Sequence, residues 1–211
     1  MSDPQIFSVV QVPILGQLGE DTEIIESRTC STCNAAPLQE IDYLHYLFDY
    51  WEGQLLVGVA QSFIVAEDLR NALMESDMTG FTLREMYVEY SEDYIEQPGD
   101  PDLVDFWHLS IENRIPAGSG WWTRDGVCPD CGRTRWRMNE FTTRGITRGH
   151  LDPKVPPRTV VRSGYKGWDI FYLDDPGTAV ISERMRDFLL AHGVVGLEVQ
   201  QAVFVETPEG L

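Results

Sequence analysis

The sequence is poor in positive charge, and what it has lies mostly in its second half. Of 211 residues, 16 are Lys or Arg and 34 are Asp or Glu, which gives a net charge of −18. Residues 1–112 carry 22 acidic and 3 basic residues, whereas residues 113–211 carry 12 and 13. This balance argues against a broad nucleic-acid surface, and the acidic first half could meet a basic protein partner. Simple solvation of the surface explains the charge equally well.

Long apolar runs are also missing. No stretch approaches the roughly 18 apolar residues of a membrane-spanning helix. Residues 1–12 lack the basic and apolar regions of a signal peptide. With 43% hydrophobic and 11% aromatic residues, the chain can still bury a substantial core. We therefore expect a cytoplasmic protein without membrane contacts, folded as a single α+β domain over residues 1–211.

Familiar catalytic patterns do not occur. The four histidines form no HExxH pair, and the sequence has no GxSxG, P-loop or GxGxxG motif. His192 is expected at a helix end in a structural role. Asp174, Asp175 and Glu140 could form paired carboxylates, but adjacent acids in so acidic a chain are usually solvated. We predict no enzymatic activity and no catalytic residues.

The chain has only four cysteines, and all of them fall in two CxxC pairs, Cys30–Cys33 and Cys128–Cys131. Two such pairs supply the four thiolates of a tetrahedral zinc ion. The residue after a pair often needs a left-handed backbone, which suits Gly132 and, less well, Asn34. We predict a structural Zn²⁺ site whose ligands are Cys30, Cys33, Cys128 and Cys131.

Other roles for these cysteines remain open at this level. Disulfides are disfavoured because nothing in the sequence indicates secretion. A redox pair needs one CxxC at the start of a helix, whereas CGRTRWRM is typical of an extended segment. The spacing alone leaves an iron–sulfur cluster open. Because 94 residues separate Cys33 from Cys128, the expected site is a clamp, a zinc-ribbon-like subregion built from about 26–38 and 120–140.

One segment is repeated. Residues 62–92 align with 178–208 without a gap, at an offset of 116 and with four identities: Glu67/Glu183, Arg70/Arg186, Leu73/Leu189 and Gly80/Gly196. The pattern predicts a strand–helix–strand unit used twice, through duplication or through shared motif use. In the second copy Ser182 is the expected N-cap, and Gly193 the expected end of the helix. Its expected apolar face comprises Met185, Phe188, Leu189 and His192.

Most other segments are typical of strands. The expected strands lie within 5–12, 22–28, 102–111, 169–175 and 197–205. Residues 38–51 have apolar positions at 41, 44, 47 and 48, which favours a helix, although the tyrosines also permit a strand. The predicted fold class is therefore α+β, a mainly antiparallel sheet with a few helices.

Arginine and tryptophan gather around the second cysteine pair. This cluster comprises Arg124, Arg133, Arg135, Arg137, Arg144 and Arg148, with Trp121, Trp122 and Trp136. Such a mixture can bind single-stranded nucleic acid by charge and stacking. The chain's own acids could instead neutralise these arginines. A nucleic-acid-binding or transcription-associated zinc-ribbon protein is therefore the alternative function.

The two CxxC pairs, the glycine after the second, and the closing segment VISERMRDFLLAHGVVGLEV (180–199) resemble the double-CxxCG motif family, which is expanded in myxobacteria. The closing segment is also similar to one found in other bacterial immunity-protein families. The resemblance implies an immunity protein that binds and blocks a toxin delivered by neighbouring kin cells, with the four cysteines as metal ligands and no catalytic residues. The first motif departs from the family pattern, because Asn34 follows it in place of glycine. A toxin that acts on nucleic acid has a basic cleft, which the acidic first half could occupy.

Overall fold

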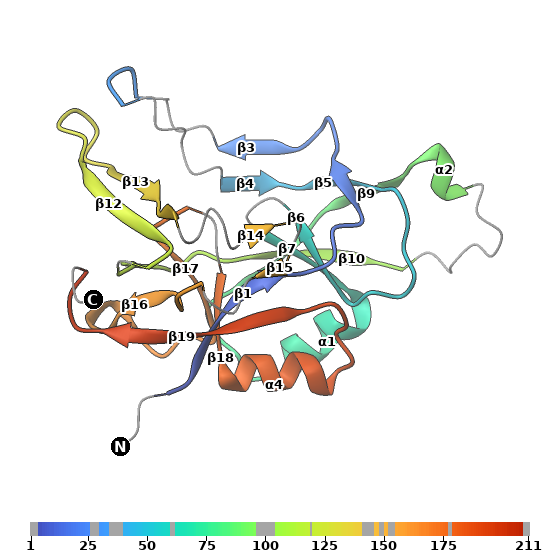
Figure 1. Cartoon of the computed structure of the whole chain (residues 1–211). Helices are drawn as coiled ribbons and strands as arrows, with labels where there is room; N and C mark the ends of the chain where they lie inside the picture. Colours follow the sequence, from blue (N-terminus) through green and yellow to red (C-terminus); the bar gives the residue numbers. More distant parts are fainter. Residues whose placement is uncertain are drawn as a thin grey trace.

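The structure of the chain is a computed structural model, which describes residues 4–25, 30–33, 40–59, 62–95, 104–118, 120–140, 146–147, 150–151, 155–176 and 179–208. It is mainly β and rich in antiparallel pairs, as predicted (Figure 1). Two nine-residue helices, α1 (Glu67–Glu75) and α4 (Glu183–Ala191), lie beside the sheets, and α2 (Glu92–Ile95) is a single turn. Among the described residues, no helix has the length and apolar character needed to cross a membrane.

The largest sheet has six strands, in the order β11-β17-β18-β1-β19-β16. The central strand β1 pairs antiparallel with β18 and β19, while β11 and β16 join the edges in parallel. Its strands are β1 (Ile6–Gln11), β11 (Arg114–Ile115), β16 (Thr159–Val161), β17 (Ile170–Leu173), β18 (Ala179–Ser182) and β19 (Glu198–Val205).

A second sheet of four antiparallel strands has the order β6-β7-β10-β8. Its strands are β6 (Leu56–Val59), β7 (Ser62–Ala66), β8 (Thr82–Glu85) and β10 (Phe106–Ser110). One apolar cluster joins both sheets and both long helices, because Phe63 and Leu69 pack in the same core as Ile181 and Met185. Burial of this shared core holds the two sheets together.

Smaller sheets extend from these two. One contains β2 (Gly16–Leu18), β5 (His45–Phe48) and β9 (Tyr87–Tyr90), and its inner face packs on a second core cluster. Three further pairs join β3 (Glu23–Ile25) to β4 (Glu40–Tyr43), β12 (Trp122–Val127) to β13 (Thr134–Met138), and β14 (Ile146–Thr147) to β15 (His150–Leu151). A short 3-10 helix η1 (Arg162–Gly164) follows β16.

Both copies of the repeated segment form strand, helix and strand, and the helix bounds match at the 116-residue offset. In each copy a glycine with positive φ precedes the second strand, Gly80 at 102° and Gly196 at 73°. The two strands of each copy flank an antiparallel central strand, β10 in the first and β1 in the second. This central strand follows the first copy along the chain but precedes the second, so the two copies differ in connectivity.

The local predictions for the second copy hold at most positions. Ser182 is the N-cap of α4, and its Oγ accepts a hydrogen bond from the Met185 backbone N–H at 3.0 Å. Met185 and Leu189 are buried, as their spacing predicts. His192 lies at the C-cap, which confirms the expected helix end, but it is exposed and does not belong to a buried face; its Nδ1 lies 2.8 Å from the Phe188 carbonyl oxygen.

The favoured helix over residues 38–51 is wrong. Within its described part, 40–51, the chain forms the strands β4 and β5. The buried side chains of Leu44, Tyr46 and Phe48 alternate with period two, which is the strand pattern. Parallel pairing of β5 with β9, a strand about 40 residues away, decides between the two periodicities.

Candidate metal centre

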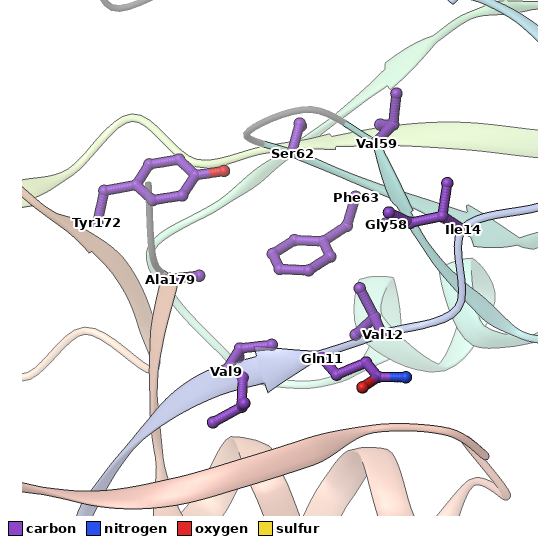
Figure 2. Close-up of a pocket in the computed structure, with 11 residues that line it drawn as sticks. Val9, Gln11, Val12, Ile14, Gly58, Val59, Ser62, Phe63, Tyr172 and Ala179 are labelled. Carbon is purple, nitrogen blue, oxygen red and sulfur yellow. The ribbon is translucent and has the colours of Figure 1, made fainter. Parts of the chain in front are cut away.

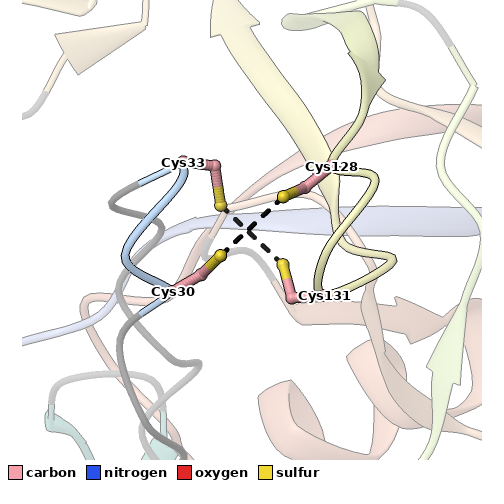
Figure 3. A group of neighbouring side chains, drawn as sticks. All are labelled: Cys30, Cys33, Cys128 and Cys131. Atoms are coloured by element: carbon pink, nitrogen blue, oxygen red, sulfur yellow. Dashed lines mark hydrogen bonds between the residues drawn. The ribbon is translucent and has the colours of Figure 1, made fainter.

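Cys128 and Cys131 lie at the tip of the hairpin formed by β12 and β13. The backbone N–H of Cys128 donates to the Arg133 carbonyl at 2.9 Å, and that of Gly132 donates to the Cys128 carbonyl at 2.9 Å. Gly132 has φ of 70°, the left-handed conformation expected after the second cysteine. These bonds fold the tip into a tight turn from which both sulfur atoms point to the same side (Figure 3).

Cys30 and Cys33 form the facing turn, in the short described segment 30–33. The two turns also touch through their middle residues, since the Thr32 hydroxyl donates to a carboxylate oxygen of Asp130. Asn34, expected to favour the turn after the first pair, lies outside the described residues.

The structure brings the four predicted residues together, and their Sγ atoms all lie within 4.8 Å of one another (Figure 3). The Cys30–Cys128 and Cys33–Cys131 sulfur pairs are each separated by 3.8 Å. Four sulfurs at about 2.3 Å from one tetrahedral ion are about 3.8 Å apart, so the spacing fits a single ion. All four cysteines are free, and a sulfur separation of 3.8 Å excludes disulfide bonds in this structure.

Backbone amides near the sulfurs favour the thiolate form. Hydrogen bonds from the backbone N–H groups of Cys33 and Thr32 lower the pKa of Cys30 to about 6. Backbone N–H groups of Cys131 and Asp130 likewise lower the pKa of Cys128. In each cysteine turn, backbone N–H groups therefore favour the loss of the proton from one sulfur, and metal binding requires this loss.

The pKa of Cys131 shifts in the opposite direction. The backbone N–H of Arg133 lowers its pKa, but partial burial and hydrogen bonds to the three other sulfurs outweigh this effect and raise the pKa to about 11. Close thiols that share protons in this way lose them together when a cation replaces the protons. Four thiolates would fill a tetrahedral shell and leave no position for water or substrate, so the arrangement is suited to structure and not to catalysis.

The base of the β12–β13 hairpin is anchored independently of its tip. Trp121 is buried before β12, and its indole N–H donates to the Pro156 carbonyl at 2.8 Å. The Arg158 guanidinium stacks on the Trp121 ring at 5.0 Å and pairs with Asp175, and both charged side chains are buried. Asp175 is therefore a structural partner of Arg158, not a member of a carboxylate pair.

Asp174, the neighbour of Asp175, also has a structural role. Its carboxylate accepts a hydrogen bond from the Ala117 backbone N–H at 2.7 Å and lies 3.9 Å from Arg124. The third predicted carboxylate, Glu140, is exposed just after β13. The structure does not bring these acids together as a catalytic pair.

The histidines are distributed over separate parts of the molecule. His45 is buried beneath a hollow lined by Glu20, Asp21 and Glu89, and its Nε2 lies 3.1 Å from a carboxylate oxygen of Glu89. His108 is buried in β10, with Nε2 at 2.6 Å from the Ser62 hydroxyl. Ser62 can donate its proton to the Leu109 carbonyl at 2.9 Å, and the Nδ1 of His108 has no partner. Burial lowers the pKa of His108 to about 4, and nearby Arg84 adds to the effect, so this Ser–His contact lacks the features of an activated nucleophile.

Two hollows were not predicted from the sequence. One has a volume of about 220 Å³ and lies between β1, the β6–β7 hairpin and β18. The other has a volume of about 450 Å³ and is lined by Glu20, Asp21, His45 and Glu89, among others. Both join residues far apart in the chain, and no local motif marks them.

The sequence matches no family model and no curated protein. The resemblance to the double-CxxCG motif family therefore stays a prediction.

Proposed function

We propose that this chain is an immunity protein, which neutralises a cognate toxin by binding it stoichiometrically while a structural zinc ion holds its two cysteine turns together. The observation that carries the proposal is an acidic concave surface on the outer face of the β2-β5-β9 sheet. Such a surface suits the basic cleft of a toxin that acts on nucleic acid.

Zinc is the ion that suits the four-sulfur centre best. Zinc accepts four thiolates in a tetrahedron, and a hairpin that carries one knuckle opposite a second knuckle is the arrangement of a zinc ribbon. The clamp would join segment 30–33 to the β12–β13 hairpin across 94 residues of chain. Holding the surface rigid before binding reduces the entropy lost when the partner docks.

The acidic concave surface is defined by Glu20, Asp21 and Glu89 around the buried ring of His45. The carboxylates of Asp21 and Glu89 are 78% and 48% exposed, so they are available to a partner. The Asp21 backbone N–H donates to His45 Nδ1 at 3.2 Å, which leaves the Nε2–H to donate to Glu89. The histidine thus fixes the orientation of the acidic rim.

The rim also carries apolar and aromatic side chains suited to a protein contact. Tyr87 and Leu18 are 44% and 37% exposed beside the acids. Tyrosine is enriched in protein interfaces, and a hollow of 450 Å³ can accept a lysine or arginine side chain. A basic protein partner would pair its lysine or arginine side chains with the acids and pack against the exposed Tyr87 and Leu18.

The proposal is tested by isolating the partner and measuring inhibition. The zinc-loaded chain is used to capture a partner from the native host, and the purified partner is assayed for toxic activity with increasing amounts of the chain. We expect inhibition to be complete near one chain per toxin. Residual activity at a large excess of the chain would contradict the proposal.

The acidic surface is tested with paired variants. Glu20→Gln with Asp21→Asn should weaken toxin binding by about ten-fold, and binding should fall as salt rises. The control pair, Asp68→Asn with Glu75→Gln on the exposed face of α1, removes the same charge elsewhere and should have little effect. Equal losses in both pairs would show that only net charge matters.

Nucleic-acid binding is the second candidate, and one observation favours it. Arg135 and Arg137 are exposed on one face of β13, next to the metal centre, and neither pairs with an acid among the described residues. Arg124 differs, because it lies 3.9 Å from Asp174 and stacks on Trp136. Arg144 and Arg148 lie outside the described residues. Salt-dependent retention on single-stranded DNA that is lost in Arg135→Ala with Arg137→Ala would support this candidate.

A further inference from the structure

A cavity of about 220 Å³ with many apolar lining side chains opens where the two main sheets meet (Figure 2). Its lining comes from three distant parts of the chain: the end of β1, the β6–β7 hairpin, and β17 with β18. The apolar lining side chains include Val9, Val12, Ile14, Val59, Phe63 and Ala179. A cavity of roughly 150 Å³ with such a lining holds benzene, so this one has room for a single ring with a short substituent.

A buried hydroxyl group without a hydrogen-bond partner among the described residues borders the cavity. The Tyr172 side chain extends from β17 toward Ser62 and Phe63 (Figure 2), and only 6% of the residue is exposed. Its hydroxyl oxygen is buried and has no hydrogen-bond partner within the part of the chain that the structure describes. Burial raises the pKa of Tyr172, so the group is a neutral O–H donor. An orphan buried hydroxyl is rare in folded proteins, because it loses its bonds to water without replacement.

Ser62 does not supply this missing partner. Its hydroxyl contacts His108 at 2.6 Å and donates to the Leu109 carbonyl at 2.9 Å. No hydrogen bond joins the Ser62 and Tyr172 hydroxyls in the described part of the chain. A ligand group that accepts a hydrogen bond from Tyr172 would satisfy this buried hydroxyl.

The backbone of β1 is irregular beside the cavity. The pairing of β1 with β19 shifts register between Val9 and Gln11, where one extra residue is accommodated. Val9, Val10, Gln11 and Val12 all line the cavity, which a regular strand with alternating side chains would not achieve as readily. Bulges of this kind redirect side chains next to binding sites.

We propose that this cavity binds a small, mainly apolar molecule with one hydrogen-bond acceptor, such as a single-ring ketone or aldehyde, whose carbonyl oxygen accepts from the Tyr172 hydroxyl. The ring packs among the valines, Ile14 and Phe63. The cavity shares no lining residue with the four cysteines or with the acidic concave surface.

The test is a titration of the zinc-loaded full chain with acetophenone, followed by methyl signals in carbon–proton correlation spectra. We expect saturable shifts for Val9, Val12 and Val59, while Val127 on the exposed hairpin does not move. Ethylbenzene has the same ring without the acceptor, and it should bind about five-fold more weakly. Absence of saturable shifts at the three valines, or equal affinity for both probes, would overturn the proposal.

Variants separate the hydroxyl from the shape of the cavity. Tyr172→Phe should weaken acetophenone binding about five-fold and leave ethylbenzene binding unchanged. Tyr50→Phe, at an exposed tyrosine, is the matched control and should change neither. Ala179→Leu should fill the cavity and abolish both. An unchanged acetophenone affinity in Tyr172→Phe would contradict the assignment, and if that variant does not fold, the two-probe comparison in the natural protein decides.

Discussion

At the scale of single residues, the four cysteines of the candidate metal centre differ in burial. It is the most buried of the four cysteines, with 1% exposed, while Cys131 at the same turn is exposed. If the four sulfurs hold one ion as proposed, replacement of Cys128 removes one ligand and leaves an incomplete tetrahedron.

Cys128→Ser should lose the metal and lower the melting temperature by about 10 °C, because about 3–5 kcal/mol of metal-linked stability disappears. Metal content and calorimetry of the purified variant measure both effects. Pro129→Ala, in the same turn but without a ligand atom, is the control and should keep its metal. Retention of both metal and melting temperature in Cys128→Ser would show that the four sulfurs do not share an ion.

Because His108 is buried, we expect the free energy of unfolding to depend on pH. Burial and Arg84 lower its folded pKa to about 4, below the ordinary 6.5 of the unfolded chain. The unfolded state therefore binds the proton more tightly, so His108 contributes stability above pH 6.5 that is lost as pH falls toward 4. The loss amounts to about 3 kcal/mol, since each pKa unit corresponds to about 1.4 kcal/mol.

Urea unfolding of the natural chain and of His108→Gln, measured from pH 7.5 to 4.5, isolates this contribution. The natural chain should lose more stability over this range than the variant. Thiolate protonation affects both proteins equally and cancels in the difference. Identical pH profiles for the two would contradict the buried, neutral state of His108.

The sequence predicts correctly that the four cysteines come together, because the two CxxC spacings are a local pattern. Two CxxC pairs leave few other uses for the cysteines, and the structure brings their sulfurs within 4.8 Å. Tyr172 and His45 carry no such signal. Their settings depend on Ser62, Glu89 and other residues brought close only by tertiary packing, so no local pattern could reveal them.

At the scale of elements, the repeated unit was predictable and the segment 38–51 was not. Helix α4 has the side-chain cap Ser182, and α1 has two acidic residues in its first turn. Both helices have buried apolar residues four positions apart, and a glycine follows each of them. Residues 38–51 instead have apolar positions that satisfy both periodicities. Pairing of β5 with β2 and β9 supplies the deciding contacts, and these partners are distant in the sequence.

Two glycines with positive φ, Gly80 and Gly193, differ in their surroundings. Gly80 has φ of 102°, and a Cβ there would lie 2.0 Å from the Ile170 carbonyl oxygen. Gly193 has φ of 80°, but a Cβ there would meet nothing within 4 Å. Gly80→Ala therefore combines backbone strain with a steric clash, whereas Gly193→Ala has the strain alone.

We expect Gly193→Ala to cost about 1–2 kcal/mol of unfolding free energy and Gly80→Ala to cost at least about 4 kcal/mol. Urea denaturation of both variants beside the natural chain measures the difference. Equal costs would mean that β17 does not approach Gly80 as closely as the structure shows.

At the scale of the whole molecule, the metal centre lies outside the three apolar core clusters. None of these clusters contains a cysteine, although Trp136 on β13 packs against one of them. The hairpin is also held at its base by Trp121 and Arg158. Loss of the ion should therefore free the cysteine turns while the main sheets stay folded.

Hydrogen exchange with and without a chelator tests this separation. After metal removal, amides of Cys128 and Gly132 should exchange much faster, because the turn bonds lose their support. Amides of β1, β18 and β19 should remain protected. Loss of protection throughout the six-stranded sheet would show instead that the ion is required for the entire fold.

The proposed metal centre requires that four sulfurs distant in the chain hold one zinc ion. X-ray absorption at the zinc edge of the purified chain tests it most directly. We predict one zinc per chain with four sulfur neighbours at about 2.3 Å. A chain without zinc, or with a shell that contains nitrogen or oxygen ligands, would contradict the claim.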